Sequence, residues 1–420
     1  MEKFIIKGGR KLKGEIKVNG AKNAALPILA GTVLTKNPCT ISNIPLIEDV
    51  LRQMELLEKI GAKIEKIKER TYRIWIKDIT TTYLDPKISQ KLKASILISA
   101  GLLSREGESF FPYPGGCVIG QRPRDIFLDG FEKFGAKIIP AKNGYYLKAK
   151  KIKGTKFVFP IISVTATEAM VILSVLSKGK SILINCACEP EVVNLVRFLN
   201  KCGAKIKGAG THTIYIEGVK KLNGANCKII PDRIEAGSFA ILAGATKSRI
   251  KILDIIPGHL EVFLEILRKA GVNFKIGKNY LEVIPPFELK AVNIRTREYP
   301  GFPTDLQPPF TVLLTQAKGN SLVQEVIFEG RLFYTDILNQ MGAGILMCDP
   351  HRVLVKGPTK LYGKKLISPD IRAGIALVIA ALLASGRSEI ENIYQIDRGY
   401  EKIEQRLSKI GAEIRRVKDN

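Results

Sequence analysis

The chain has few of the sequence features that are typical of membrane-spanning, secreted or disulfide-bonded proteins. Its most apolar run, from Ala373 to Ala384, is shorter than the roughly 20 residues that span a bilayer. The first ten residues lack the apolar stretch of a secretory signal. The seven cysteines are an odd number without disulfide-like spacing, which is typical of reduced thiols. The sequence therefore predicts a soluble cytoplasmic protein that does not contact a membrane.

Signatures of cofactor, metal and nucleic-acid binding are also scarce. Neither a G-x-G-x-x-G loop nor a P-loop occurs, and His212, His259 and His351 lack ligand spacing. We therefore expect no cofactor and no metal.

Lys and Arg outnumber Asp and Glu by 66 to 40, which gives a formal net charge of +26. Because the lysines are dispersed and aromatic residues make up only 7%, this charge indicates a solvated surface that steers anionic substrates. Nucleic-acid binding is kept as a minor alternative.

A helix stop recurs six times along the chain. In each copy an amphipathic helical pattern ends in glycine and continues into a short strand, as in Phe131-Glu-Lys-Phe-Gly-Ala-Lys-Ile. Glycine after a helix supplies the left-handed conformation that closes it. The spacing of 68 to 74 residues predicts an internal repeat. The six glycines are Gly61, Gly135, Gly203, Gly271, Gly342 and Gly411.

Each repeat also contains a second helical pattern that is apolar nearly all round, such as residues 94–103 and 373–383. A helix of this kind has to be buried. Alternating strands follow each capping glycine, for example Thr213-Ile-Tyr-Ile-Glu. The predicted fold class is therefore α/β, with six β-α-β-α-β-β units that have helices inside and sheets outside. Three plus three units would give two similar lobes with a cleft between them.

The loop from Pro112 to Asp125 contains the strongest candidate for chemistry. Cys117 follows two glycines, and Arg122 and Arg124 follow the thiol within seven residues. Glycine lets backbone approach a ligand closely, and proline stiffens the loop. Nearby cations lower the pKa of a thiol, which suits Cys117 to proton transfer or covalent chemistry with an anionic substrate. An exposed turn with an incidental thiol is the alternative.

Further charged candidates lie near expected helix starts. Lys22 and Asn23 fall where backbone N–H groups favour anions, although a lysine there is usually only solvated. Asp305 would either cap a helix or act as a general base. Three arginines of the last two repeats are expected to open helical segments and to converge on an anion. They are Arg331, Arg372 and Arg398.

Five motifs together resemble the enolpyruvyl transferases, in particular the family that acts on UDP-N-acetylglucosamine. The resemblance covers the chain from Met1 to about Lys418. The sister family that makes 5-enolpyruvylshikimate 3-phosphate shares the fold but lacks the cysteine loop and the lysine-asparagine turn. The motifs are G-A-K-N-A-A-L-P at 20–27, P-G-G-C-x-I-G-x-R-P at 114–123, P-D-R-I-E at 231–235, F-P-T-D-x-Q at 302–307 and I-D-R-G-Y-E at 396–401.

The resemblance implies a two-lobed inside-out α/β barrel with three repeats in each lobe. One lobe would comprise residues 21–230 and carry Cys117, and the other would comprise residues 1–20 and 231–420 and carry Asp305 and Arg398. The implied partners are phosphoenolpyruvate, bound between the lobes, and UDP-N-acetylglucosamine. The enolpyruvyl group would pass to the sugar 3-hydroxyl through a tetrahedral ketal that loses phosphate. This reaction is the first committed step of peptidoglycan synthesis.

The resemblance also assigns residue roles. Cys117 would protonate the methylene carbon of phosphoenolpyruvate, and Asp305 would accept the proton of the sugar hydroxyl. Lys22 and Arg398 would complete the catalytic set by holding the phosphate and carboxylate. The implied substrate-binding residues are Lys22, Asn23, Lys93, Arg122, Pro123, Arg124, Asp125, Ile126, Ser163, Val164, Thr165, Asp305, Ile327, Arg331, Arg372 and Arg398.

Four positions depart from the pattern of that family. Lys93 stands in place of an arginine, Ile161 in place of a lysine and Thr165 in place of a glycine, while Arg124 stands where valine is common. One cation near the diphosphate is thus lost and another gained. These changes leave open a paralogous enzyme that acts on a related nucleotide sugar. Family members with cysteine in the loop are alkylated by the epoxide fosfomycin, so the same is expected of Cys117.

Overall fold

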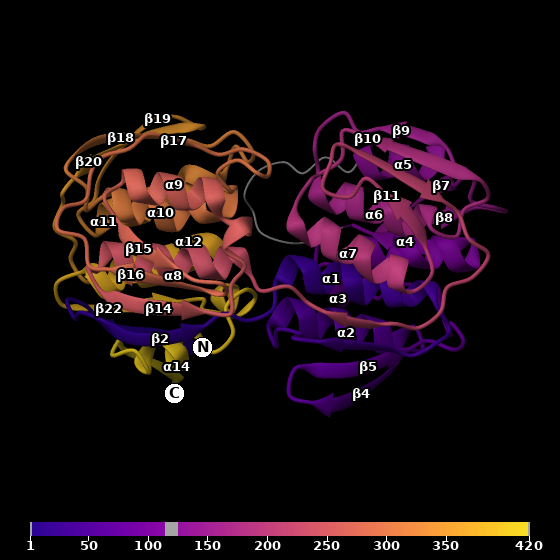
Figure 1. The fold of residues 1–420 in the computed structure, drawn as a ribbon, viewed down its shortest axis with the longest axis horizontal. Helices are drawn as coiled ribbons and strands as arrows, with labels where there is room; N and C mark the ends of the chain where they lie inside the picture. The colour runs from indigo at the N-terminus through magenta and orange to yellow at the C-terminus, as the bar shows by residue number, and fades with distance from the viewer. Residues whose placement is uncertain (1, 114–124, 419–420) are drawn as a thin grey trace. The chain divides into compact units, whose positions relative to one another are not determined.

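The computed structural model describes residues 2–113 and 125–418. These residues form two compact units. The central unit comprises residues 20–113 and 125–230, and the terminal unit comprises residues 2–19 and 231–418. In the described part of each unit, three sheets lie outside a group of helices (Figure 1).

The central unit contains the first three capping glycines. Its helices are α1 (Lys22–Gly31), η1 (Thr32–Leu34), α2 (Glu48–Lys59), α3 (Pro86–Ser89), α4 (Ser95–Glu106), α5 (Asp125–Lys133), α6 (Val164–Ser174) and α7 (Pro190–Lys201). Its strands are β3 (Cys39–Ser42), β4 (Lys63–Lys68), β5 (Thr71–Trp75), β6 (Glu108–Pro112), β7 (Lys137–Ala141), β8 (Gly144–Lys148), β9 (Lys156–Val158), β10 (Lys180–Ile184), β11 (Lys205–Lys207), β12 (Thr213–Glu217) and β13 (Asn226–Lys228). The strand orders of its sheets are β13-β3-β5-β4, β6-β8-β7 and β11-β12-β10-β9.

The terminal unit contains the other three capping glycines. Its helices are α8 (Arg233–Ala245), η2 (Pro257–His259), α9 (Glu261–Lys269), η3 (Thr304–Leu306), α10 (Gln307–Leu314), η4 (Arg331–Tyr334), α11 (Thr335–Gln340), α12 (Ile371–Leu383), α13 (Tyr394–Asp397) and α14 (Ile403–Ser408). Its strands are β1 (Glu2–Lys7), β2 (Lys13–Lys17), β14 (Arg249–Leu253), β15 (Asn273–Ile276), β16 (Tyr280–Ile284), β17 (Ile294–Arg295), β18 (Gly319–Gln324), β19 (Gly344–Asp349), β20 (Arg352–Gly357), β21 (Lys365–Ile367), β22 (Arg387–Glu391) and β23 (Glu413–Lys418). The strand orders of its sheets are β21-β22-β1-β23, β15-β16-β14-β2 and β17-β18-β20-β19.

The predicted repeat is confirmed as an α/β unit. The elements β9, α6, β10, α7, β11 and β12 follow one another in the order β-α-β-α-β-β. β9 and β10 pair in parallel, as a crossover through a helix requires, whereas β12 pairs antiparallel with both β10 and β11. Three other sheets differ, because in each of them a strand that is distant in the sequence completes the repeat.

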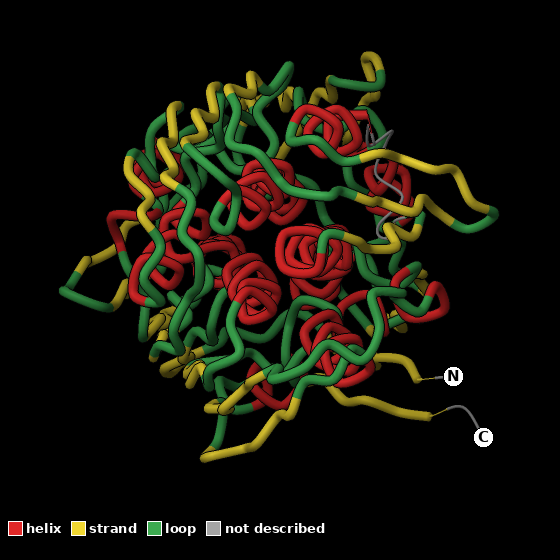
Figure 2. The backbone as a smooth tube through the Cα atoms, turned by 90° about the vertical axis from the view of Figure 1, so that its right-hand side faces the viewer, coloured by secondary structure: helices red, strands yellow, loops and turns green. Residues whose placement is uncertain are grey.

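Three pairings show how distant strands complete repeats. β2 pairs in parallel with β14 (Ile16↔Ile252), although 231 residues separate the two strands. β13 pairs in the same way with β3 (Cys227↔Ile41). β1 pairs with β23, so strands near both chain ends run side by side in one sheet (Figure 2). Each unit is thereby closed by segments that the linear repeat does not place together.

The six capping glycines end helices as predicted. Their φ angles lie between +88° and +103°, a region that favours glycine because residues with a Cβ atom are strained there. At Gly135, the glycine N–H donates to the oxygen of Glu132 at 2.8 Å, and the N–H of Ala136 donates to that of Phe131 at 3.0 Å. These bonds satisfy carbonyl groups that the helix end would otherwise leave unpaired.

The small-residue helices are buried, as their sequence requires. Every residue of α8 is buried, and α12 is buried from Ile371 to Leu382. Two separate hydrophobic cores, one in each unit, contain these helices. Among the described helices, none is long and apolar enough to cross a bilayer.

Candidate active site

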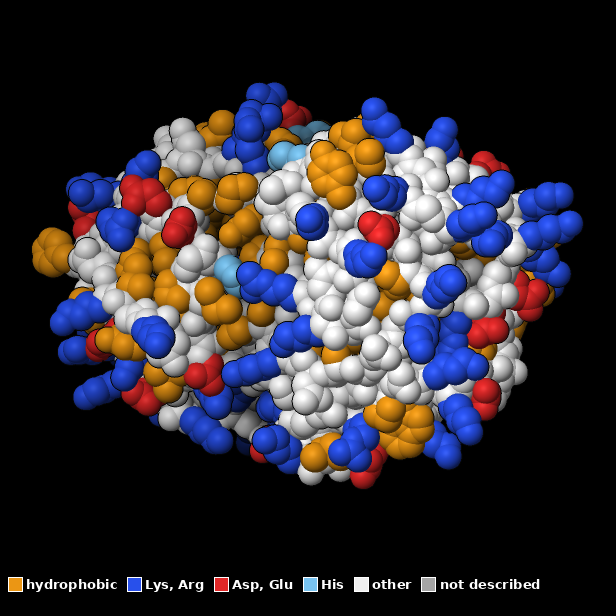
Figure 3. Space-filling model, turned by 45° about the vertical axis from the view of Figure 1, so that its right-hand side comes forward, with side chains coloured by type: hydrophobic (Ala, Val, Ile, Leu, Met, Phe, Trp, Pro, Cys, Tyr) orange, Lys and Arg blue, Asp and Glu red, His pale blue; other side chains and the backbone are white. Residues whose placement is uncertain are grey.

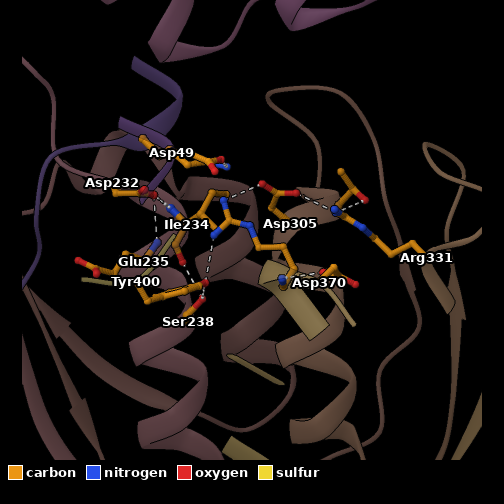
Figure 4. Close-up of polar contacts among 12 residues, drawn as sticks. Asp49, Asp232, Ile234, Glu235, Ser238, Asp305, Arg331, Asp370 and Tyr400 are labelled. Atoms are coloured by element: carbon orange, nitrogen blue, oxygen red, sulfur yellow. Dashed lines mark hydrogen bonds and ion pairs between the residues drawn. The ribbon is translucent and has the colours of Figure 1, made fainter. Parts of the chain in front are cut away.

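Asp305 lies in a turn that two buried arginines flank. Its Oδ1 atom forms an ion pair with Nη1 of Arg331 at 2.8 Å, and its Oδ2 atom forms one with Nη2 of Arg372 at 2.9 Å (Figure 4). Both arginine side chains are 5% exposed, whereas that of Asp305 is 22% exposed. The carboxylate is therefore partly exposed, whereas the two cations that hold it are buried.

The two sequence interpretations of Asp305 are distinguished by this geometry. A helix-capping carboxylate would occupy the N-cap position, but Pro303 is the N-cap of η3 and Leu306 that of α10. Asp305 is instead the middle residue of η3 and receives two guanidinium groups. Two of the three arginines, Arg331 and Arg372, meet at one anion, and that anion is the carboxylate of Asp305 itself. Charge-assisted bonds of this kind are stronger than neutral ones and fix orientation.

The turn around Asp305 is held by a buried carboxylate that the sequence did not indicate. Glu325 is fully buried just after β18, and its Oε2 atom accepts from the hydroxyl of Thr304 at 2.8 Å. Its Oε1 atom accepts from the hydroxyl of Thr296 at 2.9 Å and from the N–H of Ile327 at 2.8 Å. Glu325 thus ties the Asp305 turn to the loop of Ile327, a half-buried residue in the implied substrate-binding set.

Arg372 is the second residue of α12 and so lies at the helix start, as predicted. Asp370 caps α12 by accepting from the N–H groups of Arg372 at 2.7 Å and of Ala373 at 3.0 Å. Burial disfavours the charged guanidinium, but the Asp305 carboxylate and Tyr400 outweigh burial and raise the pKa of Arg372. The cation on this side of Asp305 is therefore permanent.

The expectation that Arg331, Arg372 and Arg398 all open helical segments is wrong for Arg398. Arg331 is the first residue of η4, whereas Arg398 follows the last residue of α13 as its C-cap. The pattern misleads because α13 is only four residues long and α14 starts after Lys402, which has a φ of +44°. Arg398 is buried and donates to Oε1 of Gln395 at 2.9 Å.

In the central unit, Lys22 is the first residue of α1, followed by Asn23, as predicted. Its ammonium group lies 3.2 Å from Oδ2 of Asp49, in the first turn of α2, and the two side chains are 13% and 6% exposed. A merely solvated lysine is therefore the wrong interpretation. Asp49 was missed because an acidic residue at a helix start ordinarily serves only the helix dipole.

A second group in the central unit surrounds the start of α6. Ser163 is the N-cap of this helix and accepts from the N–H of Ala166 at 3.4 Å, with Val164 and Thr165 in the first turn. Glu168 follows them and is fully buried. Its burial, reinforced by the charges of the buried Glu191 and Glu189, raises its pKa well above the usual range, while the charge of Lys93 opposes this rise. The sequence does not indicate this group because Glu168 lies in α6, whereas Glu189 and Glu191 lie at the start of α7.

Four implied site residues lie outside the described residues. They are Cys117, Arg122, Pro123 and Arg124. The next two are described: Asp125 is the exposed first residue of α5, and Ile126 is 3% exposed within the core of the central unit. The side chain of Ile126 therefore packs in the protein interior and does not face solvent.

Most of the described cysteines are buried. Cys39, Cys186, Cys202 and Cys227 are buried, Cys188 is half-buried and Cys348 is exposed. Burial raises the pKa of Cys186 to about 12 and that of Cys227 to about 11, so these thiols stay protonated. Cys348 lies on the outer face of β19, where exposed positions alternate with more buried ones.

Positive charge is dispersed over the visible face in the space-filling view, where Lys and Arg side chains alternate with uncharged and acidic ones (Figure 3). Nothing in this view concentrates them into a single stripe. Within the described residues, no group of three or more His, Cys, Asp or Glu side chains could hold a metal ion.

Comparison with known proteins shows to which enzyme family the chain belongs. Residues 6–407 match the family of EPSP synthase (3-phosphoshikimate 1-carboxyvinyltransferase), and the chain belongs to this enolpyruvyl transferase family. The resemblance to enolpyruvyl transferases is thereby confirmed.

Relatives within this class share much more of the sequence. UDP-N-acetylglucosamine 1-carboxyvinyltransferase from Halothermothrix orenii is 44% identical over 418 residues, with all of both chains covered. UDP-N-acetylglucosamine 1-carboxyvinyltransferase 1 from Carboxydothermus hydrogenoformans is 43% identical, with 99% of both chains covered. Among solved structures, the enolpyruvyl transferase NikO from Streptomyces tendae has a TM-score of 0.91 at 22% identity, with 100% of this chain and 99% of that chain covered. EPSP synthase from Acinetobacter baumannii has a TM-score of 0.76 at 18% identity, with both chains fully covered. These two likenesses establish the fold.

Proposed function

We propose that the chain transfers the enolpyruvyl group of phosphoenolpyruvate to the 3-hydroxyl of UDP-N-acetylglucosamine and releases phosphate. This proposal rests on sequence identity to two enzymes named UDP-N-acetylglucosamine 1-carboxyvinyltransferase. The identity is 44% to one and 43% to the other, in both cases over essentially the whole chain. The reaction would make the chain a cytoplasmic enzyme of peptidoglycan synthesis.

The geometry of Asp305 supports its role as the base of this reaction. Attack by the sugar 3-hydroxyl on C-2 of phosphoenolpyruvate requires that the hydroxyl lose its proton to a positioned acceptor. Asp305 presents a partly exposed carboxylate whose two oxygens are oriented by Arg331 and Arg372. A general base needs this combination of access and fixed orientation. The tetrahedral ketal formed by the attack then loses phosphate.

Other residues carry proposed roles that follow from the family resemblance. Cys117 would deliver the proton to the methylene carbon of phosphoenolpyruvate, which makes C-2 electrophilic. Lys22 and Arg398 would bind the anionic groups of this substrate, and fixed cations stabilise the charge of a departing phosphate. Ser163 and Ile327 would contact the nucleotide sugar.

The direct test is phosphate release from phosphoenolpyruvate in the presence of a panel of nucleotide sugars. We expect release with UDP-N-acetylglucosamine and much slower release with UDP-glucose, which lacks the N-acetyl group. The product should gain the mass of one enolpyruvyl group. Absence of phosphate release with every nucleotide sugar in the panel would contradict the proposal.

A second candidate is an enolpyruvyl transferase that prefers a related nucleotide sugar. It is motivated by Ile161, which replaces the lysine usual in the family and is 52% exposed just before α6. A missing cation at an exposed position changes how a diphosphate is held. Faster release with another member of the panel would favour this candidate.

Arg124 is the cation gained where Ile161 removes one, so Arg124→Val should weaken binding of the diphosphate. We expect KM for the nucleotide sugar to rise about tenfold, the effect of losing one charge-assisted contact, with little change in KM for phosphoenolpyruvate. Arg73→Val is a matched control, because Arg73 is an exposed arginine of β5 that pairs with Glu65. Equal nucleotide-sugar KM values for the two variants would mean that Arg124 makes no such contact.

A further inference from the structure

Tyr400 lies behind Arg372 on the side away from solvent. It is fully buried in the segment between α13 and α14, and its hydroxyl accepts from Nη1 of Arg372 at 3.2 Å. Arg372 uses its other terminal nitrogen, Nη2, to reach Asp305. One guanidinium group therefore bridges the phenol and the carboxylate (Figure 4).

The proton positions in this chain of contacts follow from the chemistry of the groups. A guanidinium can only donate, so the oxygen of Tyr400 must accept from Arg372. The Tyr400 hydroxyl proton then points to Oγ of Ser238, 2.9 Å away. The Ser238 hydroxyl in turn donates to the carbonyl oxygen of Ile234 at 2.8 Å. This series of hydrogen bonds therefore ends on a backbone carbonyl of α8, a helix that is buried along its whole length.

Burial keeps this arrangement in one protonation state. It raises the pKa of Tyr400 to about 12, although the charge of Arg372 opposes the rise. The phenol therefore keeps its proton near neutral pH and remains the donor to Ser238. A buried network with unpaired polar groups would cost stability, whereas in this network Arg372, Tyr400 and Ser238 each have a hydrogen-bond partner.

We propose that Tyr400 is a positioning residue for the reaction: it holds Arg372 so that the guanidinium orients the carboxylate of Asp305. This inference rests on the proposed role of Asp305 as the base. Arg331 already has a second anchor, since its Nη1 group also donates to the hydroxyl of Thr304 at 2.8 Å. Tyr400 supplies the corresponding anchor for Arg372. A long arginine side chain without one loses its fixed orientation, because its rotamers are then free.

The test compares Tyr400→Phe with Tyr334→Phe. Tyr334 is a matched control because it is also a buried tyrosine of the terminal unit. Its hydroxyl accepts from Gln307 at 2.8 Å, whereas Arg331, which lies in the same short helix η4, donates to Thr304 and Asp305. For Tyr400→Phe we expect kcat to fall about tenfold with both KM values within about twofold, as for loss of an interaction that orients the base. For Tyr334→Phe we expect kcat within about twofold of the unaltered protein.

The pH profile separates positioning from a general loss of stability. Among the described residues, the charged groups around this site include Arg331 and Arg372, with Asp232, Glu325 and Asp370 beyond them. If Arg372 moves, the carboxylate loses a favourable cation, so its proton is held more tightly. The acid limb of the pH profile of kcat should therefore shift to higher pH in Tyr400→Phe and stay in place in Tyr334→Phe. This difference should remain even if the melting temperatures of both variants fall by similar amounts.

Ser238→Ala provides a second variant in case Tyr400→Phe does not fold. It removes the acceptor of the Tyr400 hydroxyl and should shift the acid limb in the same direction with a smaller loss of kcat. Unchanged kcat and an unchanged acid limb in a folded Tyr400→Phe or Ser238→Ala protein would overturn the inference. Failure of the proposed function would show differently, as an unaltered protein that releases no phosphate.

Discussion

Replacement of Asp305 by asparagine is expected to lower kcat by about 10²–10⁴-fold, the range typical for loss of a positioned base. Asparagine keeps the shape of the side chain and can still accept from one arginine, but it cannot take the sugar hydroxyl proton. Binding of phosphoenolpyruvate should persist, because Asp305 acts on the other substrate. Steady-state phosphate release and a direct binding titration with phosphoenolpyruvate would measure the two effects.

Asp305→Ala should abolish turnover for the same reason, but it also leaves two buried guanidinium groups without their carboxylate. Breaking a buried ion pair can cost about 3–5 kcal/mol, so a urea melt must accompany the assay. Asp349→Asn is a suitable control, because this carboxylate also pairs with an arginine, Arg352, at 2.7 Å. Near-normal turnover of a folded Asp305→Asn protein would exclude Asp305 as the base.

Fosfomycin is expected to inactivate the protein completely and in a time-dependent manner, with one inhibitor mass added to Cys117. The cations that bind the substrate phosphate should also bind the inhibitor's phosphonate, which places its epoxide beside a nucleophilic thiol. Inactivation should be faster when the nucleotide sugar is present. Mass spectrometry of a digested sample would locate the adduct.

The exposed Cys348 makes a control necessary, since it is the most exposed of the described thiols and could compete for the inhibitor. Cys348→Ser should be inactivated as fast as the unaltered protein. Cys117→Asp should stay active yet resist, because a carboxylate delivers a proton but attacks an epoxide poorly. An adduct on Cys348, or active protein without any adduct, would remove Cys117 from its assigned role.

The helix stops were predictable because their cause is local. A glycine such as Gly135 closes a helix through its own φ angle and two nearby hydrogen bonds, so the repeat could be read directly. Burial of α12 was likewise predictable, since a helix that is apolar all round has no polar face to present to water. Arg398 was placed wrongly because the end of a four-residue helix leaves no periodic signal.

The pairing at Asp305 was not predictable in the same way. Residues 305, 331 and 372 belong to three separate segments, and only the packing of η3, η4 and α12 makes two guanidinium groups meet one carboxylate. Sequence placed Asp305 near a helix start and so left a capping role open. Glu325 lies in no recognised motif, and the I-D-R-G-Y-E motif that contains Tyr400 does not show that its hydroxyl contacts Arg372. A single buried polar residue looks like any other until its neighbours are known.

The sequence by itself therefore determined the α/β class, the repeating β-α-β-α-β-β unit and, through five motifs, the enolpyruvyl transferase family. These depend on local backbone preferences, on hydrophobic periodicity and on short runs of residues, all of which are written along the chain. Only the tertiary structure decided that β1, β2 and β13 complete distant repeats and that Asp305 lies between two anchored arginines. Strand pairing and charge pairing depend on which segments the fold brings together, and that is a property of the packed chain.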